Sequence, residues 1–275
     1  TRRSAPQGLT LAFHVVIPAR YASTRLPGKP LLDIAGRPMV QHVVERACAS
    51  GATQVLVATD DARIAAVVSD PRAPGLGIAV MTDPALASGT DRVAAVAAGL
   101  GWSDDTIVVN VQGDEPLLPP TLIDQVARLL ERDAAAGIAT LGSPIESLEQ
   151  FVDPNVVKVV TATDGAALYF SRAPIPWTRD GAPAGLASQR DFGDALRHVG
   201  IYAYRVGVLR RITSLAPSGL ELREKLEQLR AMQNGVRIVV GTCVEAPGPG
   251  VDTEQDLERA RTRAARGAGS TGGNQ

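Results

Sequence analysis

Residues 107–116 read Ile-Val-Val-Asn-Val-Gln-Gly-Asp-Glu-Pro, and the fold class can be argued from them. The mainly apolar run Ile107–Val111 is typical of a strand buried on both faces, as in a parallel sheet. It ends in Gln112–Pro116, where polar and turn-forming residues follow. A buried strand that ends in carboxylates predicts an α/β protein with a polar site at the carboxyl edge of its sheet.

The same alternation of apolar strands and amphipathic helices extends to both sides of this stretch. Short apolar runs predict strands, and apolar residues at helical spacing predict helices. The predicted strands lie at 13–17, 55–58, 78–81 and 138–141, and the predicted helices lie at 38–51, 62–68, 92–98 and from about 120. This order predicts an α/β fold with a mostly parallel sheet sandwiched by helices.

The pattern changes after about residue 145. Strands are expected at 156–160, 167–170, 199–204 and 236–240, and a charged helix is expected at about 253–266. Leu222, Leu226 and Leu229 are expected on one face of a further helix. The Gly/Pro-rich stretch 174–193 predicts a long loop, and such loops are usually functional or lie at an interface.

Composition excludes several function classes. Lys and Arg number 28 against 29 Asp and Glu, so the formal charge is −1, and no basic run suggests binding to nucleic acid. Hydrophobic residues at 45% exclude disorder of the whole chain. The longest segment without charged residues is 4–19; it contains prolines and a glycine and cannot cross a bilayer as a helix. Cys48 and Cys243 are expected to be buried thiols of a cytoplasmic protein.

The loop after the first strand, residues 18–30, carries three cations and little competing acid. Arg20, Arg25 and Lys29, with free backbone amides, can neutralise a triphosphate. A solvated basic loop is the alternative. The loop is not a Walker motif, because Ser23 stands where the first glycine belongs and Pro30 follows Lys29. The loop carries no dinucleotide fingerprint Gly-x-Gly-x-x-Gly either.

Two further segments offer ligands. Asp114, at the tip of a buried strand, is suited to Mg²⁺, which takes one or two carboxylates plus substrate phosphates. The alternative is that Asp114 or Glu115 merely caps a turn or helix. The segment 88–92, Ser-Gly-Thr-Asp-Arg, exposes amide and hydroxyl groups to a base or phosphate, or else is an ordinary helix N-cap.

Seven short segments together resemble the 3-deoxy-manno-octulosonate (Kdo) cytidylyltransferase family, in order and in rough spacing from about residue 13 to 265. The matching segments are 20–30, 88–92, 112–116, 169–173 (Tyr-Phe-Ser-Arg-Ala), 197–202 (Arg-His-Val-Gly-Ile-Tyr), 226–230 (Leu-Glu-Gln-Leu-Arg) and 251–253 (Val-Asp-Thr). The resemblance implies a nucleotide-diphospho-sugar-transferase type fold and a homodimer. It also implies Mg²⁺-dependent transfer of CMP from CTP to Kdo, with release of pyrophosphate, for lipopolysaccharide synthesis.

The resemblance assigns roles to individual residues. It implies that Arg20, Arg25 and Lys29 contact the triphosphate, that Ala19, Ser88 and Gly89 surround the cytidine, and that Gln112 lies between nucleotide and sugar. Asp114 and Asp252 match metal-binding aspartates. The sugar-acid side is matched by Arg172, His198, Tyr202, Glu227 and Gln228. Arg172 is suited to pairing with a carboxylate; without the resemblance, His198 reads as a satisfied strand histidine and Glu227 as part of a solvated helix face.

In this reading the anomeric hydroxyl attacks the α-phosphorus of CTP, and no protein nucleophile is needed. Arg20, Lys29, Asp114 and Asp252 are the expected catalytic residues, and the two aspartates are expected to converge on the cations beside the phosphates. One alternative is a cytidylyltransferase for another acid, such as a small phosphonate. Another is a non-catalytic nucleotide-binding module. A nicotinamide dehydrogenase is disfavoured, because that glycine fingerprint does not follow the first strand.

The expected organisation is a single domain over 11–266. Its nucleotide-binding part covers about 11–145, a smaller β-containing part for acceptor binding and dimerisation covers about 146–235, and a closing segment covers 236–266. Residues 1–10 and 267–275 are expected to be flexible tails. The protein is expected in the cytoplasm, without nucleic-acid or membrane partners.

Overall fold

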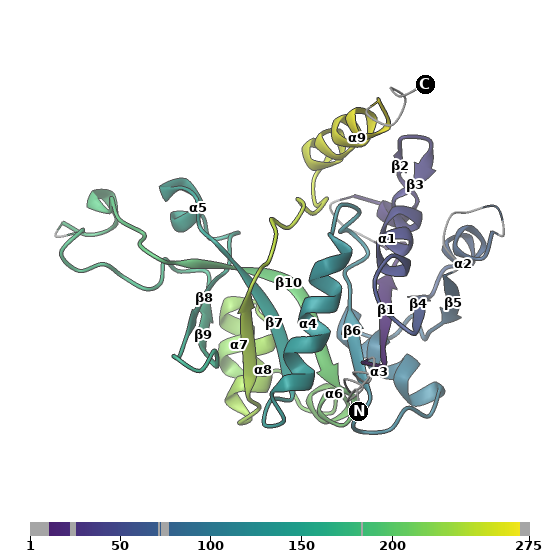
Figure 1. Ribbon diagram of the computed structural model, residues 1–275, viewed down its shortest axis with the longest axis horizontal. Helices are drawn as coiled ribbons and strands as arrows, with labels where there is room; N and C mark the ends of the chain where they lie inside the picture. Colours follow the sequence, from purple (N-terminus) through teal and green to yellow (C-terminus); the bar gives the residue numbers. More distant parts are fainter. Residues whose placement is uncertain (1–10, 23–25, 71, 73–76, 183, 270–275) are drawn as a thin grey trace, which may run out of the picture.

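The computed structural model describes residues 11–22, 26–70, 72, 77–182 and 184–269. Within them a nine-stranded sheet has seven strands in the order β11-β7-β10-β6-β1-β4-β5, extended at β10 by β8 and then β9 (Figure 1). The strands are β1 (Phe13–Ala19), β4 (Gln54–Thr59), β5 (Ile78–Met81), β6 (Ile107–Asn110), β7 (Ile138–Pro144), β8 (Lys158–Thr161), β9 (Ala167–Ser171), β10 (Leu196–Arg205) and β11 (Ile238–Thr242).

The sheet is parallel on both sides of one antiparallel strand. β6, β1, β4 and β5 run parallel to their neighbours, and β11 runs parallel to β7. β10 lies antiparallel between β6 and β7. The prediction of a mostly parallel α/β sheet is therefore confirmed. Of the strands predicted after residue 145, those at 156–160 and 167–170 form the antiparallel pair β8–β9, which pairs with β10, and the one at 236–240 is β11.

Helices cover both faces of the sheet, each with its own apolar cluster. On one face, α1 (Met39–Cys48), α2 (Ala62–Val68) and α4 (Pro120–Arg132) pack on side chains from β1, β4 and β6. On the other, α3 (Gly89–Gly99), α6 (Val206–Thr213) and α8 (Gln228–Gln233) pack on the alternate side chains of the same strands. Alternation along β1 explains both clusters, because Val15 and Val16 point to opposite faces and both are fully buried.

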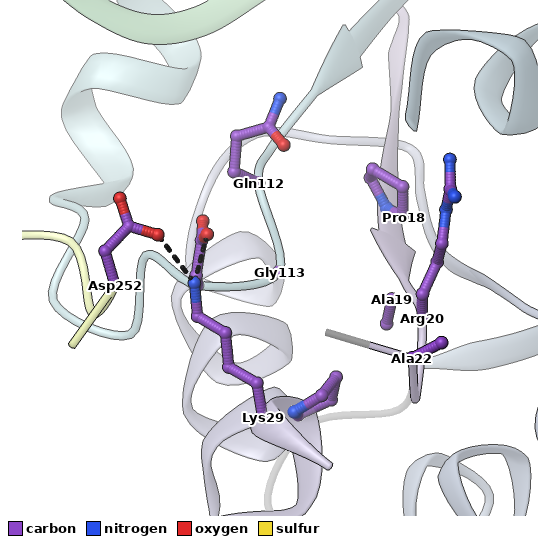
Figure 2. Close-up of a pocket in the computed structure, with 10 residues that line it drawn as sticks. Pro18, Ala19, Arg20, Ala22, Lys29, Gln112, Gly113 and Asp252 are labelled. Carbon is purple, nitrogen blue, oxygen red and sulfur yellow. Dashed lines mark hydrogen bonds and ion pairs between the residues drawn. The ribbon is translucent and has the colours of Figure 1, made fainter. Parts of the chain in front are cut away.

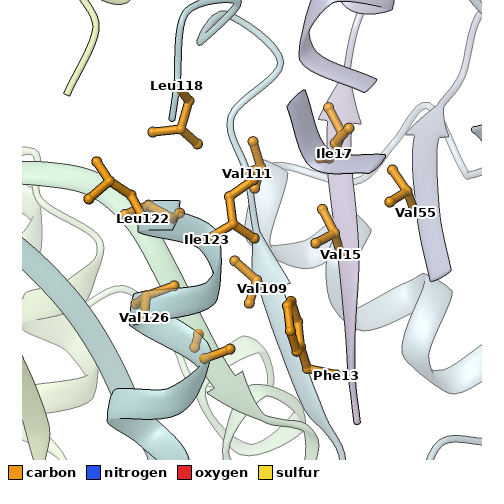
Figure 3. Close-up of a cluster of buried hydrophobic side chains, with 14 of the residues drawn as sticks. Phe13, Val15, Ile17, Val55, Val109, Val111, Leu118, Leu122, Ile123 and Val126 are labelled. Carbon is orange, nitrogen blue, oxygen red and sulfur yellow. The ribbon is translucent and has the colours of Figure 1, made fainter. Parts of the chain in front are cut away.

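The side of α4 that faces the sheet forms the centre of the first cluster (Figure 3). Leu122, Ile123 and Val126 are fully buried against strand residues such as Val15 and Val109. Burial of one such side chain contributes roughly 1.5–3 kcal/mol, so this packing fixes the strand ends relative to one another.

The predicted helix with Leu222, Leu226 and Leu229 on one face is wrong. The chain forms two short helices, α7 (Gly219–Glu224) and α8, separated at Lys225 in the left-handed conformation (φ 55°). As a result Leu222 is exposed, while Leu226 and Leu229 are buried. The break gives Glu227 a position between the helices instead of on a solvated face.

Several short elements lacked a sequence signal and were not predicted. They are η1 (Lys29–Leu31), β2 (Asp33–Ile34), β3 (Arg37–Pro38), α5 (Leu148–Val152), η2 (Leu186–Ser188) and α6. The stretch 174–193 is mainly loop, as predicted, and extends away from the main sheet together with α5 (Figure 1). Cys243 is half-buried and Cys48 is exposed, so the expectation of burial is wrong for Cys48; neither forms a disulfide.

The C-terminal helix α9 (Glu254–Gly269) lies beside the β2–β3 hairpin (Figure 1). It runs three residues past the end expected at 266. Leu257 and Ala260 are buried against Leu26, Ile34 and Met39, and the Arg261 guanidinium donates to the carbonyl of Asp33. Among the described residues, no helix is both long and apolar enough to span a bilayer. Residues 1–10, expected to be a flexible tail, and residues 270–275 of the expected C-terminal tail lie outside the described residues.

Candidate active site

A pocket of about 360 Å³ opens at the carboxyl edge of the sheet, where β1 and β6 end (Figure 2). The loop after β1 forms one wall, the loop after β6 forms another, and the segment before α9 completes it. The lining residues are Pro18, Ala19, Arg20, Ala22, Lys29, Pro30, Gln112, Gly113, Asp114 and Asp252. This is the edge at which open α/β sheets bind ligands.

Lys29 joins two carboxylates in this pocket. Its Nζ lies 2.6 Å from Asp114 Oδ2 and 3.0 Å from Asp252 Oδ1, and Figure 2 shows both contacts as dashed lines. The Lys29 side chain is 12% exposed, against 34% for Asp114 and 51% for Asp252. The aspartates thus converge on one cation while their outer oxygens remain accessible from the pocket.

Close backbone approach holds the acidic residues in place. The amide of Val251 donates to the carbonyl of Asp114 (2.9 Å), which ties the segment before α9 to the loop after β6. A Cβ on Gly113 would lie 2.7 Å from the carbonyl oxygen of Pro18, closer than real Cβ atoms come. Only glycine therefore allows the loops after β1 and β6 to lie this close.

The base of the loop after β1 is closed around Tyr21. The amide of Gly28 donates to the Tyr21 carbonyl (3.1 Å), and Gly28 has φ +68°, with its Cα against the tyrosine ring. The Arg63 guanidinium stacks on the ring at 3.5 Å and pairs with Asp61, the N-cap of α2. Lys29 follows directly as the first residue of η1. Arg25 lies outside the described residues.

Burial and negative neighbours change the acidity of Glu115. Burial raises its pKa to about 8, with Asp114 and Asp252 adding to the rise and Arg197 and Lys29 opposing it. The residue is therefore largely neutral at neutral pH, which limits the negative charge in this part of the site.

Arg20 lies on the opposite side of the pocket and points away from Lys29 (Figure 2). Its guanidinium donates to the carbonyl of Ala87, which links the loop after β1 to the start of α3. Ser88 is the N-cap of α3 in a capping box with Asp91. Gly89 packs on Pro18, where an added Cβ would lie 3.1 Å from the proline ring.

Glu227 connects this helix start to α8. Its carboxylate lies 3.1 Å from Ser88 Oγ and 2.9 Å from Thr90 Oγ1, and both hydroxyls are placed to donate. Burial raises the Glu227 pKa, and the two hydroxyls oppose the rise. Without the family resemblance, Glu227 was expected on a solvated helix face. This expectation is wrong, because the break at Lys225 turns Glu227 inward. Thr90 belongs to the segment 88–92 singled out from the sequence, but its contact with Glu227 was not predicted.

His198 lies inside the sheet. Thr140 Oγ1 donates to the carbonyl of Ile201 (2.7 Å) and therefore accepts from His198 Nε2 (2.9 Å). The ring packs edge-on against Phe170 and beside Tyr202 at 5.2 Å between centroids. Burial lowers the His198 pKa to about 3. The residue is a neutral, hydrogen-bonded strand histidine, and Tyr202, whose pKa burial raises, is also uncharged.

Arg172 is held by backbone carbonyls. Its Nε donates to the carbonyl of Glu224 (2.7 Å) and its Nη1 to that of Pro154 (2.8 Å). The Glu224 carboxylate accepts from the Arg172 amide, and the fully buried Lys158 donates to the Arg172 carbonyl. Sequence reasoning missed Lys158 and Glu224; a lone lysine in an apolar strand was the available signal for Lys158.

A buried ion pair near the start of α3 was also missed. Arg92 is fully buried, and its guanidinium lies 2.6 Å from both Asp60 Oδ2 and Thr82 Oγ1. The pair joins α3 to the ends of β4 and β5. Arg92 stood in the segment that sequence analysis singled out, but its partner could not be identified without the fold.

The predicted residues fall into two groups in the structure. Those that line the pocket are Ala19, Arg20, Lys29, Gln112, Asp114 and Asp252. Ser88 and Gly89 adjoin it through the contacts of Ala87 and Pro18. Arg172, His198, Tyr202, Glu227 and Gln228 do not line it. They belong to β9, β10 and α8 or the turn before α8, on the side of the smaller β region.

The donor set at Lys29 fits a hard divalent cation. Within the described residues there is no group of three or more His, Cys, Asp or Glu placed to hold a metal. Two converging carboxylates nevertheless match Mg²⁺, which keeps waters and takes its remaining ligands from substrate phosphates.

The sheet, the pocket at its carboxyl edge and the cation–carboxylate cluster define a nucleotidyltransferase, a class supported by the family model Cytidylyltransferase, which matches residues 14–238. The chain belongs to the 3-deoxy-manno-octulosonate cytidylyltransferase family. It is 54% identical to the protein of that name from Thioalkalivibrio sulfidiphilus over 250 residues, covering 90% of this chain and 97% of the relative. The protein of the same name from Marinobacter nauticus is 55% identical over 262 residues, covering 94% and 98%.

Solved structures of similar fold agree with this family assignment. A CMP:2-keto-3-deoxy-manno-octonic acid synthetase complexed with CTP has a TM-score of 0.82 and 44% identity, covering 93% of this chain and 99% of that one. A putative glucose-1-phosphate thymidylyltransferase from Bacillus anthracis, in complex with sucrose, has a TM-score of 0.60 at 16% identity, covering 92% and 95%. At this identity, the similarity to the thymidylyltransferase concerns the fold alone.

Proposed function

We propose that this protein transfers CMP from CTP to the anomeric hydroxyl of Kdo and releases pyrophosphate. The names of the relatives and the CTP bound by the structural neighbour support this reaction. The observation that carries it is the cluster of Lys29, Asp114 and Asp252 in a pocket at the carboxyl edge of the sheet.

The nucleotide occupies this pocket in the proposal. Lys29 and Arg20, on opposite sides of it, bind the triphosphate and stabilise charge that grows on its oxygens in the transition state. Arg25, in the same loop, is assigned the same role from its place in the sequence. Ala19, Ser88 and Gly89 surround the cytidine, and Gln112 lies between nucleotide and acceptor.

Asp114 and Asp252 would hold Mg²⁺. The bound cations would lower the pKa of the attacking hydroxyl and take up charge on the phosphates. The aspartates then orient the phosphate chain, and Lys29 directs its ammonium to the phosphate oxygens. In the proposal the anomeric hydroxyl attacks the α-phosphorus of CTP directly and in line, so no protein nucleophile is needed.

The acceptor lies toward β9, β10 and α8. Arg172 is proposed to pair with the sugar-acid carboxylate, and His198, Tyr202, Glu227 and Gln228 to bind hydroxyls. Because burial keeps His198 neutral, the residue acts as a hydrogen-bonding group and not as a charge. Positioning of the acceptor alone can contribute roughly 7–11 kcal/mol to rate acceleration.

The wider setting is part of the same proposal. We place the reaction in the cytoplasm, where CTP is made, and its product in lipopolysaccharide synthesis. The protein is proposed to act as a homodimer through the smaller β region.

Measurement of pyrophosphate release tests whether Kdo is the acceptor. Purified protein is incubated with CTP and Mg²⁺ and with Kdo or a set of small phosphonates in parallel. We expect release with Kdo and a CMP-linked sugar product, and none above background with phosphonates. Faster release with a phosphonate than with Kdo would overturn the acceptor and leave cytidylyl transfer intact.

A further inference from the structure

The aspartates proposed to hold the metal already have a cationic partner. The Lys29 ammonium lies 2.6 Å from Asp114 and 3.0 Å from Asp252, within hydrogen-bond distance of both. At 12% exposure, the Lys29 side chain is the most buried member of the cluster. The ammonium therefore offsets one of the two negative charges of the pair from within the protein.

A divalent cation and this ammonium compete for the same oxygens. If Mg²⁺ entered while Lys29 stayed, three positive charges would lie against the two negative charges of Asp114 and Asp252. Like charges at such distances repel strongly in a partly buried site.

Lys29 has an alternative position when nucleotide is present. A lysine is a point charge on a flexible stem, so its ammonium can move while its backbone stays in η1. Phosphate groups entering the pocket offer it new anionic partners and bring the negative charge that a second cation requires. The carboxylates are then released for the metal.

We propose that Lys29 occupies the metal position in the nucleotide-free protein, so that a divalent cation binds well only after phosphates draw the ammonium away. The inference rests on the proposed function for the identity of the phosphates. Because binding free energies are reciprocal, the same competition makes the metal strengthen nucleotide binding. Lys29 thereby links the two binding events in addition to contacting phosphate.

Arg20 provides a matched control. It is a cation lining the same pocket, but its guanidinium donates to the Ala87 carbonyl and makes no contact with Asp114 or Asp252. Replacing Arg20 removes one positive charge from the pocket without freeing the carboxylates. A comparison of Lys29 and Arg20 variants therefore distinguishes competition for the carboxylates from a general change in the charge of the pocket.

The test measures metal binding without nucleotide. Mn²⁺, which accepts the same oxygen ligands, is titrated into wild type, K29M and R20M, and free Mn²⁺ is followed by EPR. We expect K29M to bind Mn²⁺ about 10-fold more tightly than wild type, since one nearby charge shifts ionic equilibria by a factor of about 10 or more. R20M should stay within about 3-fold of wild type. The double variant K29M/D114N should lose the gain.

Two results would overturn the proposal: equal Mn²⁺ affinity in K29M and wild type, or an equal gain in R20M and K29M. K29Q is a second variant if K29M does not fold. Melting gives an independent readout, because the repulsion between carboxylates that have lost Lys29 should be relieved by the metal. Mg²⁺ should then raise the Tm of K29M more than that of wild type. Neither measurement uses CTP or Kdo, so failure of the acceptor assignment would leave this result standing.

Discussion

Asp114 is the residue on which the proposed chemistry depends most directly. Its carboxylate contacts Lys29, and its backbone carbonyl fixes the segment before α9, so side chain and backbone have separate roles. Asp114→Asn keeps the shape and the backbone contact but removes the charge. We expect turnover to fall by at least about 10²-fold at saturating Mg²⁺ while the Tm changes little. Pyrophosphate release measures the turnover, and thermal melting measures the Tm.

The exposed Asp105→Asn is the control for loss of an acidic charge at the surface. It should retain the turnover of the wild type. Near-native turnover of Asp114→Asn would show that Asp114 does not hold a catalytic metal.

His198 makes the stability of the protein depend on pH. Its pKa is lowered from 6.5 to about 3 in the folded protein because burial disfavours the charged form. Below pH 6.5 the unfolded chain therefore binds a proton that the folded protein does not, and stability falls as the pH falls toward 3. Between pH 7.5 and pH 5, His198 lowers the free energy of unfolding by about 2 kcal/mol.

His198→Gln keeps a hydrogen-bond donor for Thr140 but cannot titrate. The variant should lack this part of the pH dependence when the free energy of unfolding is measured with urea at both pH values. Other groups, including His14 and His42, contribute equally to variant and wild type. Parallel pH profiles for the two proteins would contradict the assignment.

At the residue scale, sequence alone indicated the kinds of ligand but not their partners. The aspartates were expected to converge from their match to family motifs, and the structure brings them together. The position of Lys29 between them, the carbonyls that hold Arg172 and the hydroxyls on Glu227 depend on contacts between distant segments. No local pattern records such contacts.

At the scale of elements, the close approach of the loops after β1 and β6 brings the phosphate-binding and acidic residues together. Gly113→Ala would place a methyl group 2.7 Å from the carbonyl oxygen of Pro18, and backbone cannot give way as a flexible side chain does. We expect the loops to separate, with stability lower by about 1–3 kcal/mol and turnover reduced by about 10²-fold, since small displacements at a reacting centre are costly.

Gly99→Ala is the matched control, since nothing lies within 4 Å of its Cβ position in α3. This variant should be neutral or slightly stabilising. Urea unfolding and steady-state kinetics are measured for both. A Gly113→Ala protein with native turnover would show that the loops tolerate separation.

The main elements could be predicted because their periodicity is strong. β4, α2 and β5 match their predicted ranges within one residue at each end, since continuous apolar runs and apolar helical faces allow one assignment. The break between α7 and α8 could not be predicted, because Lys225 adopts the left-handed conformation although its residue type carries no turn signal. The short α5 and the two-residue strands β2 and β3 have too few residues to show a period.

At the scale of the whole molecule, the site is closed by a segment from the far end of the chain. Asp252 lies two residues before the start of α9. This helix reaches the phosphate-binding loop through one small apolar cluster, in which Leu257 packs with Leu26 and Met39. The position of Asp252 thus depends on the docking of a helix that lies outside the two main layers (Figure 1).

Leu257→Ala should weaken this docking. Loss of a buried leucine side chain costs about 2–5 kcal/mol where it packs, and here the cost falls on a peripheral helix and not on the two main clusters. We expect faster amide hydrogen exchange in 254–264 with little change in the exchange of β1 and β6. We also expect KM for CTP to rise several-fold, because the carboxylate of Asp252 is then no longer held in the nucleotide pocket. The exposed Gln255→Ala on the same helix should change neither. If Leu257→Ala accelerates exchange in α9 while KM for CTP stays native, then docking of α9 is not needed to place Asp252, and the link between the end of the chain and the nucleotide pocket is wrong.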